Sequence, residues 1–115
     1  MRYIALIYNE ENGTGELNEA EWAEMMTKYN AFSAEARAAG VTAGGEALQP
    51  THTATTVRVR DGNIQTMDGP FAETKEVLGG YYILDCANLD DAIHWAAKIP
   101  GARHGSVEVR PLVEF

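Results

Sequence analysis

The chain has 115 residues, of which 45% are hydrophobic and 23% are charged, and its formal net charge is −8. This length accommodates a single domain, residues 1–115, with one hydrophobic core. The acidic balance excludes nucleic acid as a partner, because phosphate binding needs a basic surface, and it also argues against binding to anionic membranes.

The first predicted element is a strand at residues 2–8. Its side chains alternate between two apolar sets, one made of Tyr3, Ala5 and Ile7 and the other of Ile4, Leu6 and Tyr8. Because both faces of this strand are apolar, both should be covered in the folded protein.

A long helix is predicted over residues 19–39. Asn18 and Glu21 form an Asn-x-x-Glu capping box at its start, and Leu17 and Trp22 occupy the two positions of a hydrophobic staple. Apolar side chains recur at helical spacing and define one face that should pack into the core. These residues are Trp22, Met25, Met26, Tyr29, Phe32 and Ala36.

The middle of the chain predicts shorter strands. Residues 41–48 form one of them, and residues 55–60 form another with clean alternation. Asp61-Gly62 is typical of a tight hairpin turn, after which residues 63–66 should return along the preceding strand. In the strand at 55–60 the predicted inward residues are Val57 and Val59, and the outward residues are Arg58 and Arg60.

The C-terminal part completes the pattern. Residues 80–86 predict a strand that is again apolar on both faces, and residues 106–115 predict the last strand. Between them a second helix should begin at Asn88 and end at Pro100-Gly101. Its predicted inward residues are Leu89, Ala92, Ile93, Ala96 and Ala97.

The order β-α-β-β-α-β is that of the ferredoxin-like α+β fold, an antiparallel sheet with two helices on one face. The first and third main strands lie in the middle of such a sheet. The strands with two apolar faces, 2–8 and 80–86, are therefore predicted to be central, and 55–60 and 106–114 are predicted to be the edges.

Two helices cover only one face of this sheet, so apolar residues on the other face need a second partner. A homodimer that packs sheet on sheet is the economical answer. A ligand cleft on the open face is the alternative, and the two can coexist.

The single cysteine, Cys86, lies in an apolar run, which predicts a buried and unreactive thiol. The histidines at 52, 94 and 104 show no metal-ligand spacing, so no metal is expected. The sequence does not imply an organic cofactor either. No apolar run approaches the roughly 20 residues of a membrane-spanning helix. The first eight residues are too short and too strand-like for a signal peptide, so we expect a cytoplasmic location.

Several segments together resemble the YCII-related family, and in particular its DGPF group, named after an Asp-Gly-Pro-Phe signature like that of Asp68 to Phe71. The resemblance covers nearly the whole chain and implies the dimeric α+β barrel architecture. That architecture carries several unrelated activities, so it does not settle a reaction. Glu46 and Arg110 lie in matching segments and are candidates for a charged pair. The segments are residues 45–50, 56–62, 68–76, 79–83 and 107–111.

Asp68 is the candidate catalytic residue. In the broader family an aspartate at the equivalent place pairs with a helix histidine, and the pair is a proposed acid/base dyad. Residues 27–29 of the first predicted helix are Thr, Lys and Tyr, so the histidine partner is absent here. The competing interpretation is that Asp68 makes an Asx-type bond in a turn shaped by Gly69-Pro70.

Other side chains are candidates for ligand binding. Glu73 and Lys75 could orient a polar ligand or remain in local ion pairs. Tyr81 and Tyr82 should point to opposite faces of their strand, so only one of them can meet a cleft. The full set of candidates is Glu46, His52, Phe71, Glu73, Lys75, Tyr81 and Tyr82.

These observations favour a small-molecule-binding protein with a simple acid/base activity, such as isomerisation or hydrolysis, in which Asp68 is the acid or base. The alternative function belongs to another class. Because genes of the family lie beside those of extracytoplasmic-function sigma factors, the resemblance also implies a non-catalytic accessory protein linked to sigma-factor signalling.

Overall fold

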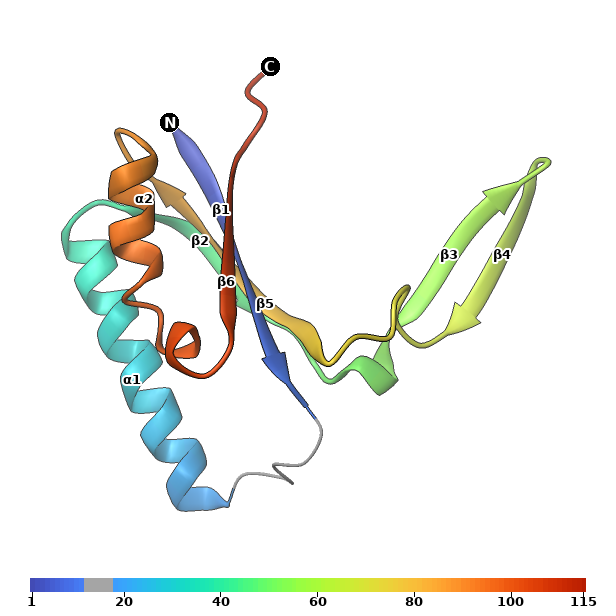
Figure 1. Ribbon diagram of the computed structural model, residues 1–115, viewed down its shortest axis with the longest axis horizontal. Helices are drawn as coiled ribbons and strands as arrows, with labels where there is room; N and C mark the ends of the chain where they lie inside the picture. The colour runs from blue at the N-terminus through green and yellow to red at the C-terminus, as the bar shows by residue number, and fades with distance from the viewer. Residues whose placement is uncertain (12–17) are drawn as a thin grey trace.

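The computed structural model describes residues 1–11 and 18–115 as an α+β protein (Figure 1). Its two helices and antiparallel strands confirm the predicted ferredoxin-like class. In chain order the elements are β1 (Arg2–Glu10), α1 (Glu19–Ala38), β2 (Thr42–Ala47), the 3-10 turn η1 (Thr51–Thr53), β3 (Thr55–Arg60), β4 (Asn63–Asp68), β5 (Glu76–Asp85), α2 (Leu89–Ala96), the 3-10 turn η2 (Pro100–Arg103) and β6 (Ser106–Pro111).

The main sheet has four strands in the order β2-β5-β1-β6, with every neighbouring pair antiparallel. β1 and β5 occupy the centre and β6 one edge, as predicted. The prediction that residues 55–60 form the other edge is wrong, because β2 lies there. Glycines let β2 approach β5: a Cβ on Gly45 would lie 2.6 Å from the Tyr81 carbonyl oxygen, and one on Gly80 would lie 2.9 Å from the Glu46 carbonyl oxygen.

Strands β3 and β4 pair with each other in a separate two-stranded sheet, which we call the arm (residues 55–68) and which projects away from the main sheet (Figure 1). Asp61 and Gly62 have φ angles of 51° and 76°, which confirms the tight hairpin turn. The prediction that Val57 and Val59 face inward is wrong: they are 60% and 58% exposed, because the arm has no core behind it.

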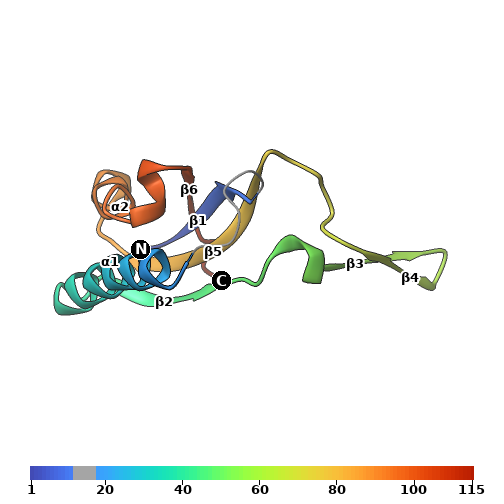
Figure 2. The ribbon, with the colours of Figure 1, turned by 90° about the horizontal axis from the view of Figure 1, so that it is seen from below.

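The core lies between the main sheet and the two helices. Phe32 of α1 packs edge-on against Tyr82 of β5, with ring centroids 5.0 Å apart, and against Trp95 of α2, at 6.5 Å. Figure 2 shows both helices on one side of the molecule and the arm reaching out on the other. The buried core residues include Tyr3, Ala5, Ile7, Phe32, Ala36, Leu84, Ala92 and Ile99.

Helix α1 begins with the predicted capping box. The backbone NH of Glu21 donates to Asn18 Oδ1 at 2.8 Å, and the Asn18 NH donates to Glu21 Oε1 at 3.4 Å. Leu17, which is predicted to form a hydrophobic staple with Trp22, lies outside the described residues. Phe32 and Ala36 are buried, whereas Trp22 is 56% exposed, so only the C-terminal half of the apolar stripe is covered.

Helix α2 buries a narrower face than predicted. Ala92 and Ala96 are buried as expected, but Leu89 and Ile93 are about half exposed, and Ala97 is also exposed. Trp95, which partly packs against the core cluster, takes the place of these larger aliphatic side chains. The small alanines allow α2 to approach β6 and β5 closely.

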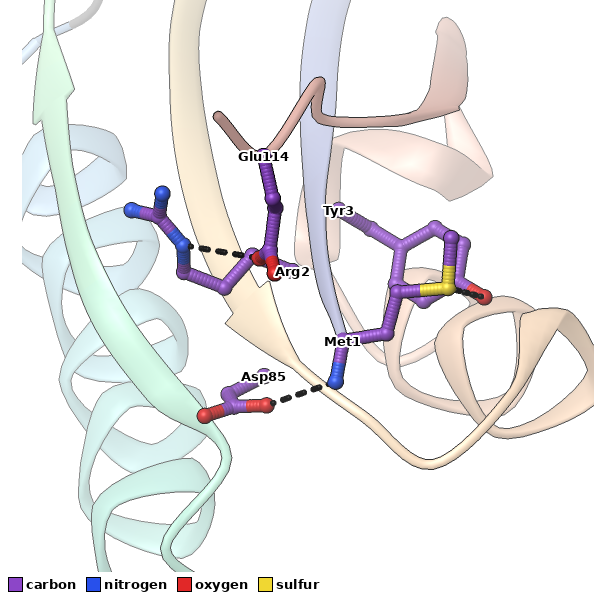
Figure 3. Close-up of polar contacts among 5 residues, drawn as sticks. All are labelled: Met1, Arg2, Tyr3, Asp85 and Glu114. Carbon is purple, nitrogen blue, oxygen red and sulfur yellow. Dashed lines mark hydrogen bonds and ion pairs between the residues drawn. The ribbon is translucent and has the colours of Figure 1, made fainter.

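The predicted burial of Cys86 is confirmed, and burial raises the pKa of its thiol, which keeps it in its less reactive protonated form. Close by, polar contacts tie down the start of β1 (Figure 3). The Met1 amino group lies 3.3 Å from Asp85 Oδ1, and Arg2 Nε lies 3.3 Å from Glu114 Oε1. The last strand ends at Pro111 rather than at residue 115.

The helices leave the other face of the main sheet uncovered. By register this open face carries a half-buried apolar stripe from the two central strands. The described chain is flat, with extents of 47 × 43 × 18 Å, and its radius of gyration of 16.1 Å exceeds the about 13 Å of a compact domain of this length. The stripe consists of Ile4, Leu6, Tyr8, Tyr81 and Ile83.

The close contact of β2 with β5 predicts that Gly45→Ala destabilises the fold. Its Cβ would meet the Tyr81 carbonyl at 2.6 Å and Tyr82 Cδ1 at 2.7 Å, and such overpacking costs about 1–3 kcal/mol. Gly79→Ala is the control, because the nearest atom to its Cβ would be the Ile7 carbonyl oxygen at 3.9 Å. Urea denaturation should show a lower unfolding free energy for Gly45→Ala only; equal values for the two variants would contradict the packing described.

Candidate functional site

Two adjacent hollows lie beneath the N-terminal half of α1. The larger one, which we call the α1 groove, has a volume of about 440 Å³ and lies between α1 and strands β2 and β5. The smaller one, the η2 hollow, has about 400 Å³ and lies between α1 and η2. Asn9, Met25 and Tyr29 line both hollows, so the two are contiguous.

Helix α1 gives the groove an amphipathic wall. The wall combines an indole, two thioethers and a phenol with an amide and a hydroxyl, and the floor is the glycine-rich end of the sheet. Concave surfaces lined mainly by apolar and aromatic side chains, with a few polar groups, are typical of small-molecule sites, which have volumes of about 300–1,000 Å³. The helix residues are Trp22, Met25, Met26, Tyr29, Asn30 and Ser33.

Tyr29 is the central polar group of the site. Burial raises the pKa of its phenol above the ordinary value, so the hydroxyl stays protonated and can donate a hydrogen bond at neutral pH. Gly101 leaves room for this hydroxyl, because a Cβ at that position would lie 2.9 Å from it. Tyr82 closes the inner end of the groove, where its ring packs on Phe32.

The groove walls carry almost no formal charge. Glu46 is the one charged residue among the described residues that line it. The register pairs Glu46 with Tyr81 and Gly45 with Tyr82, and Tyr82 is on the helix side, so the side chains of Glu46 and Tyr81 lie on the open face of the sheet. Glu46 and Tyr81 therefore line the groove with their backbone atoms. Tyr81 and Tyr82 point to opposite faces of the sheet, as predicted, and only the Tyr82 side chain faces the groove.

The η2 hollow is polar by contrast. It is lined by Glu21, Glu24, Lys28, Arg103 and His104, and Lys28 Nζ lies 3.5 Å from Glu24 Oε1. Acidic and basic groups are mixed here and several are solvent-exposed, so the hollow forms a charged mouth beside an apolar groove.

The DGPF segment lies away from the groove. Asp68 is exposed at the end of β4, and its carboxylate accepts no hydrogen bond from the residues that the structure describes. The turn is held instead by the Gly69 NH, which donates to the Ala54 carbonyl at 2.8 Å, and by the Thr56 hydroxyl, which donates to the Gly69 carbonyl at 2.9 Å. Phe71 is 77% exposed, with the Arg58 guanidinium 5.5 Å from its ring centre.

The remaining predicted residues are also separate from the groove. Lys75 Nζ pairs with Glu10 Oε1 at 3.2 Å, and Glu73 is exposed. His52 lies in η1, next to a contact in which the Glu11 carboxylate accepts hydrogen bonds from the Thr51 NH at 2.9 Å and the Thr51 hydroxyl at 2.6 Å. Of the predicted binding residues, the structure brings only Glu46, Tyr81 and Tyr82 together at the groove.

The charged pair suggested for Glu46 and Arg110 does not form within the chain. These residues lie on opposite edge strands, β2 and β6, and Arg110 pairs with Glu108 instead. Sequence reasoning also missed Asn9, Asn30 and Ser33, because it assigned the apolar stripe of the helix to the core. The sequence did contain a signal for two of these residues. Asn30 lies one helical turn after Met26, and Ser33 lies one turn after Tyr29, so both polar residues flank the apolar stripe.

The four-stranded antiparallel sheet, with two helices on one face and a groove beneath the first, defines a small ferredoxin-like α+β protein. The chain belongs to the YCII-related domain family, whose model matches residues 1–115. It is similar to an uncharacterised protein of Rhizobium meliloti (strain 1021), with 41% identity over 117 residues that span 100% of this chain and 94% of the relative.

Two further features bear on the kind of site. Within residues 1–11 and 18–115, no three His, Cys, Asp or Glu side chains gather in a way that could hold a metal ion. None of the helices in the described ranges has the length and apolarity that crossing a membrane requires.

The contact between Glu11 and Thr51 fixes η1, and hence the base of the arm, to the end of β1. Hydrogen bonds from the Thr51 hydroxyl and backbone lower the pKa of Glu11, with a smaller contribution from His52. Because the pKa is lower in the folded protein, the stabilisation is fully present above the ordinary pKa and is lost as pH falls through the folded value.

We therefore predict that Thr51→Val raises the pKa of Glu11 towards its ordinary value, as followed by carboxylate NMR during a pH titration. Thr53→Val is the control, because the Thr53 hydroxyl donates to the Pro50 carbonyl and not to Glu11. An unchanged pKa for Glu11 in Thr51→Val would show that the contact does not form in solution.

Proposed function

We propose that this YCII-related protein binds a small uncharged molecule with a flat apolar portion in the α1 groove. The observation that carries the proposal is the groove itself, about 440 Å³ of space with aromatic and thioether walls and few polar groups. Trp22 and Met26 suit an aromatic or alicyclic ring, and Tyr29, Asn30 and Ser33 suit its hydroxyl, carbonyl or amide groups. None of the described residues that line the groove itself is cationic, which disfavours carboxylates and phosphates there, whereas Lys28 and Arg103 line the adjoining η2 hollow.

The proposed chemistry is a simple acid/base step, such as isomerisation or hydrolysis. Tyr29 is a hydrogen-bond donor to a ligand carbonyl, because a phenol is protonated at neutral pH and burial raises the pKa of Tyr29 further above it. Asp68 remains the proposed acid or base, since its carboxylate is exposed and free of hydrogen bonds from the described residues. Phe71, Glu73, Lys75 and His52 remain proposed ligand contacts.

A homodimer through the open sheet face is part of this proposal. The stripe at Ile4, Leu6, Tyr8, Tyr81 and Ile83 is half-buried and has no helix above it. Packing the stripe against the same stripe of a second copy would remove both from water and double the thickness of an 18 Å plate. We also propose a cytoplasmic location for the protein.

The second candidate function is that of a non-catalytic accessory protein linked to sigma-factor signalling. The separation of Asp68 from the α1 groove within one chain favours it, because a binding site without an acid/base pair can sense a ligand but cannot transform it. The two functions share the groove and differ in whether a bound compound is turned over.

Ligand binding tests the groove directly. We expect neutral phenols and aromatic amides to raise the melting temperature, and Tyr29→Phe to weaken their affinity by roughly threefold to tenfold through loss of one hydrogen bond. Tyr8→Phe is the matched control, because Tyr8 lies on the open face. Isothermal calorimetry provides the dissociation constants; preferential binding of anionic compounds, or equal effects of the two substitutions, would contradict the proposed site.

Asp68→Asn separates the catalytic function from a structural role. The substitution should leave the unfolding free energy within about 0.5 kcal/mol of wild type, because the carboxylate is exposed. If Asp68 is the acid or base, turnover of a compound that Asp68→Asn still binds should fall strongly, as measured by NMR of the substrate over time. Loss of folding in Asp68→Asn would assign the residue to the turn, and unchanged turnover would remove it from the chemistry.

A further inference from the structure

We propose that the arm is a docking element that packs its apolar face on a second copy of this chain. The proposal rests on the homodimer described above for the presence of the second copy, and adds the arm to its interface. The arm carries an exceptional concentration of exposed hydrophobic side chains for so short a segment. Val57, Val59, Ile64 and Met67 are between 58% and 75% exposed.

The register places three of these side chains on one face. Val59 pairs with Ile64, and Val57 pairs with Thr66, so their side chains share a face of the hairpin. The opposite face carries Arg58, whose guanidinium is over the Phe71 ring. The arm is therefore two-sided: one face carries three exposed aliphatic side chains, and the other combines the Arg58–Phe71 contact with the exposed Met67.

The contacts within the hairpin are too few to account for a stable arm. Isolated two-stranded hairpins are marginally stable in water, and an exposed aliphatic face is a liability on a lone hairpin. The strands β3 and β4 make their extensive contacts with each other. The Gly69–Ala54 backbone bond closes the base of this hairpin, and the η1 contact with Glu11 links that base to the end of β1. A partner on the aliphatic face supplies the missing burial.

Charge favours a second copy as this partner. The chain has a net charge of −8, so two copies repel each other through most of their surface. The arm is neutral, because Arg58 and Arg60 balance Asp61 and Asp68. The arm can therefore contact an acidic second copy without adding to the repulsion between the two chains.

The interface area points the same way. The open face of four strands has a footprint of roughly 500 Å², and the arm, about 20 Å long and about 10 Å wide, has one of roughly 200 Å². A stable interface buries about 800 Å² on each partner. One arm given and one arm received would enlarge the footprint on each copy from roughly 500 Å² to roughly 900 Å². In a two-fold dimer each copy would give and receive one arm.

Docking of the arm also changes the setting of Asp68. Asp68 pairs with Thr55 at the base of the hairpin, on the same face as Val57 and Val59. When that face packs on the second copy, the carboxylate lies at the boundary between the two chains. The candidate acid/base residue would then act at the junction of two chains rather than alone on the surface of one.

The test compares Ile64→Glu with Gln65→Glu by sedimentation equilibrium. The two residues are neighbours on β4 with opposite faces, and each substitution adds one negative charge. We expect Ile64→Glu to weaken dimerisation by roughly tenfold or more, and Gln65→Glu, which lies opposite Arg58, to leave it close to wild type. Circular dichroism checks that both variants keep the fold, as expected for an arm outside the body.

Three outcomes overturn the proposal. If Ile64→Glu dimerises like the wild type, the arm is not part of the interface, although the sheet-on-sheet dimer survives. If both variants weaken association equally, added charge rather than the aliphatic face is responsible. If the wild-type protein is a monomer at all accessible concentrations, neither surface meets a second copy, while ligand binding in the α1 groove still decides the proposed function separately.

Discussion

The structure depends on one constraint: its main sheet is apolar on both faces, and its two helices can cover only one of them. On the helix side, the rings of Tyr82 and Trp95 pack edge-on against Phe32. The open side keeps the stripe through Leu6 and Tyr81. The flat shape and the uncovered apolar stripe follow from this one-sided layering.

The same layering creates the α1 groove. The C-terminal half of α1 is held to the sheet by Phe32 and Ala36, whereas Trp22 in the first half remains largely exposed. Space therefore opens beneath Met25 and Tyr29, over the glycines at the end of β2 and β5. The groove is thus a consequence of a helix that is longer than the core it covers, and its neutral aromatic walls define the kind of molecule it can hold.

Sequence signals between neighbouring residues predicted the local structure correctly, whereas the pairing of strands that are distant in the sequence was predicted only in part. The Asn18 capping box and the Asp61-Gly62 turn are fixed by neighbouring residues, so sequence alone identified them. Strand pairing is a tertiary choice, and alternation at 55–60 could not reveal that this strand leaves the sheet. Gly45 was the signal that β2 takes this edge position, because a glycine is needed there only where a neighbouring strand approaches closely. For the site, the sheet residues were predicted, but the helix wall was hidden because a ligand groove and a core need the same apolar stripe.

The central claim is that the open face and the arm are completed by a second copy. Hydrogen exchange of the arm amides at residues 55–68, measured at high and at low protein concentration, tests it most directly. The account predicts strong protection at high concentration that falls as dilution separates the copies, while the core amides of β1 stay protected. Rapid exchange of the arm at every concentration would contradict it.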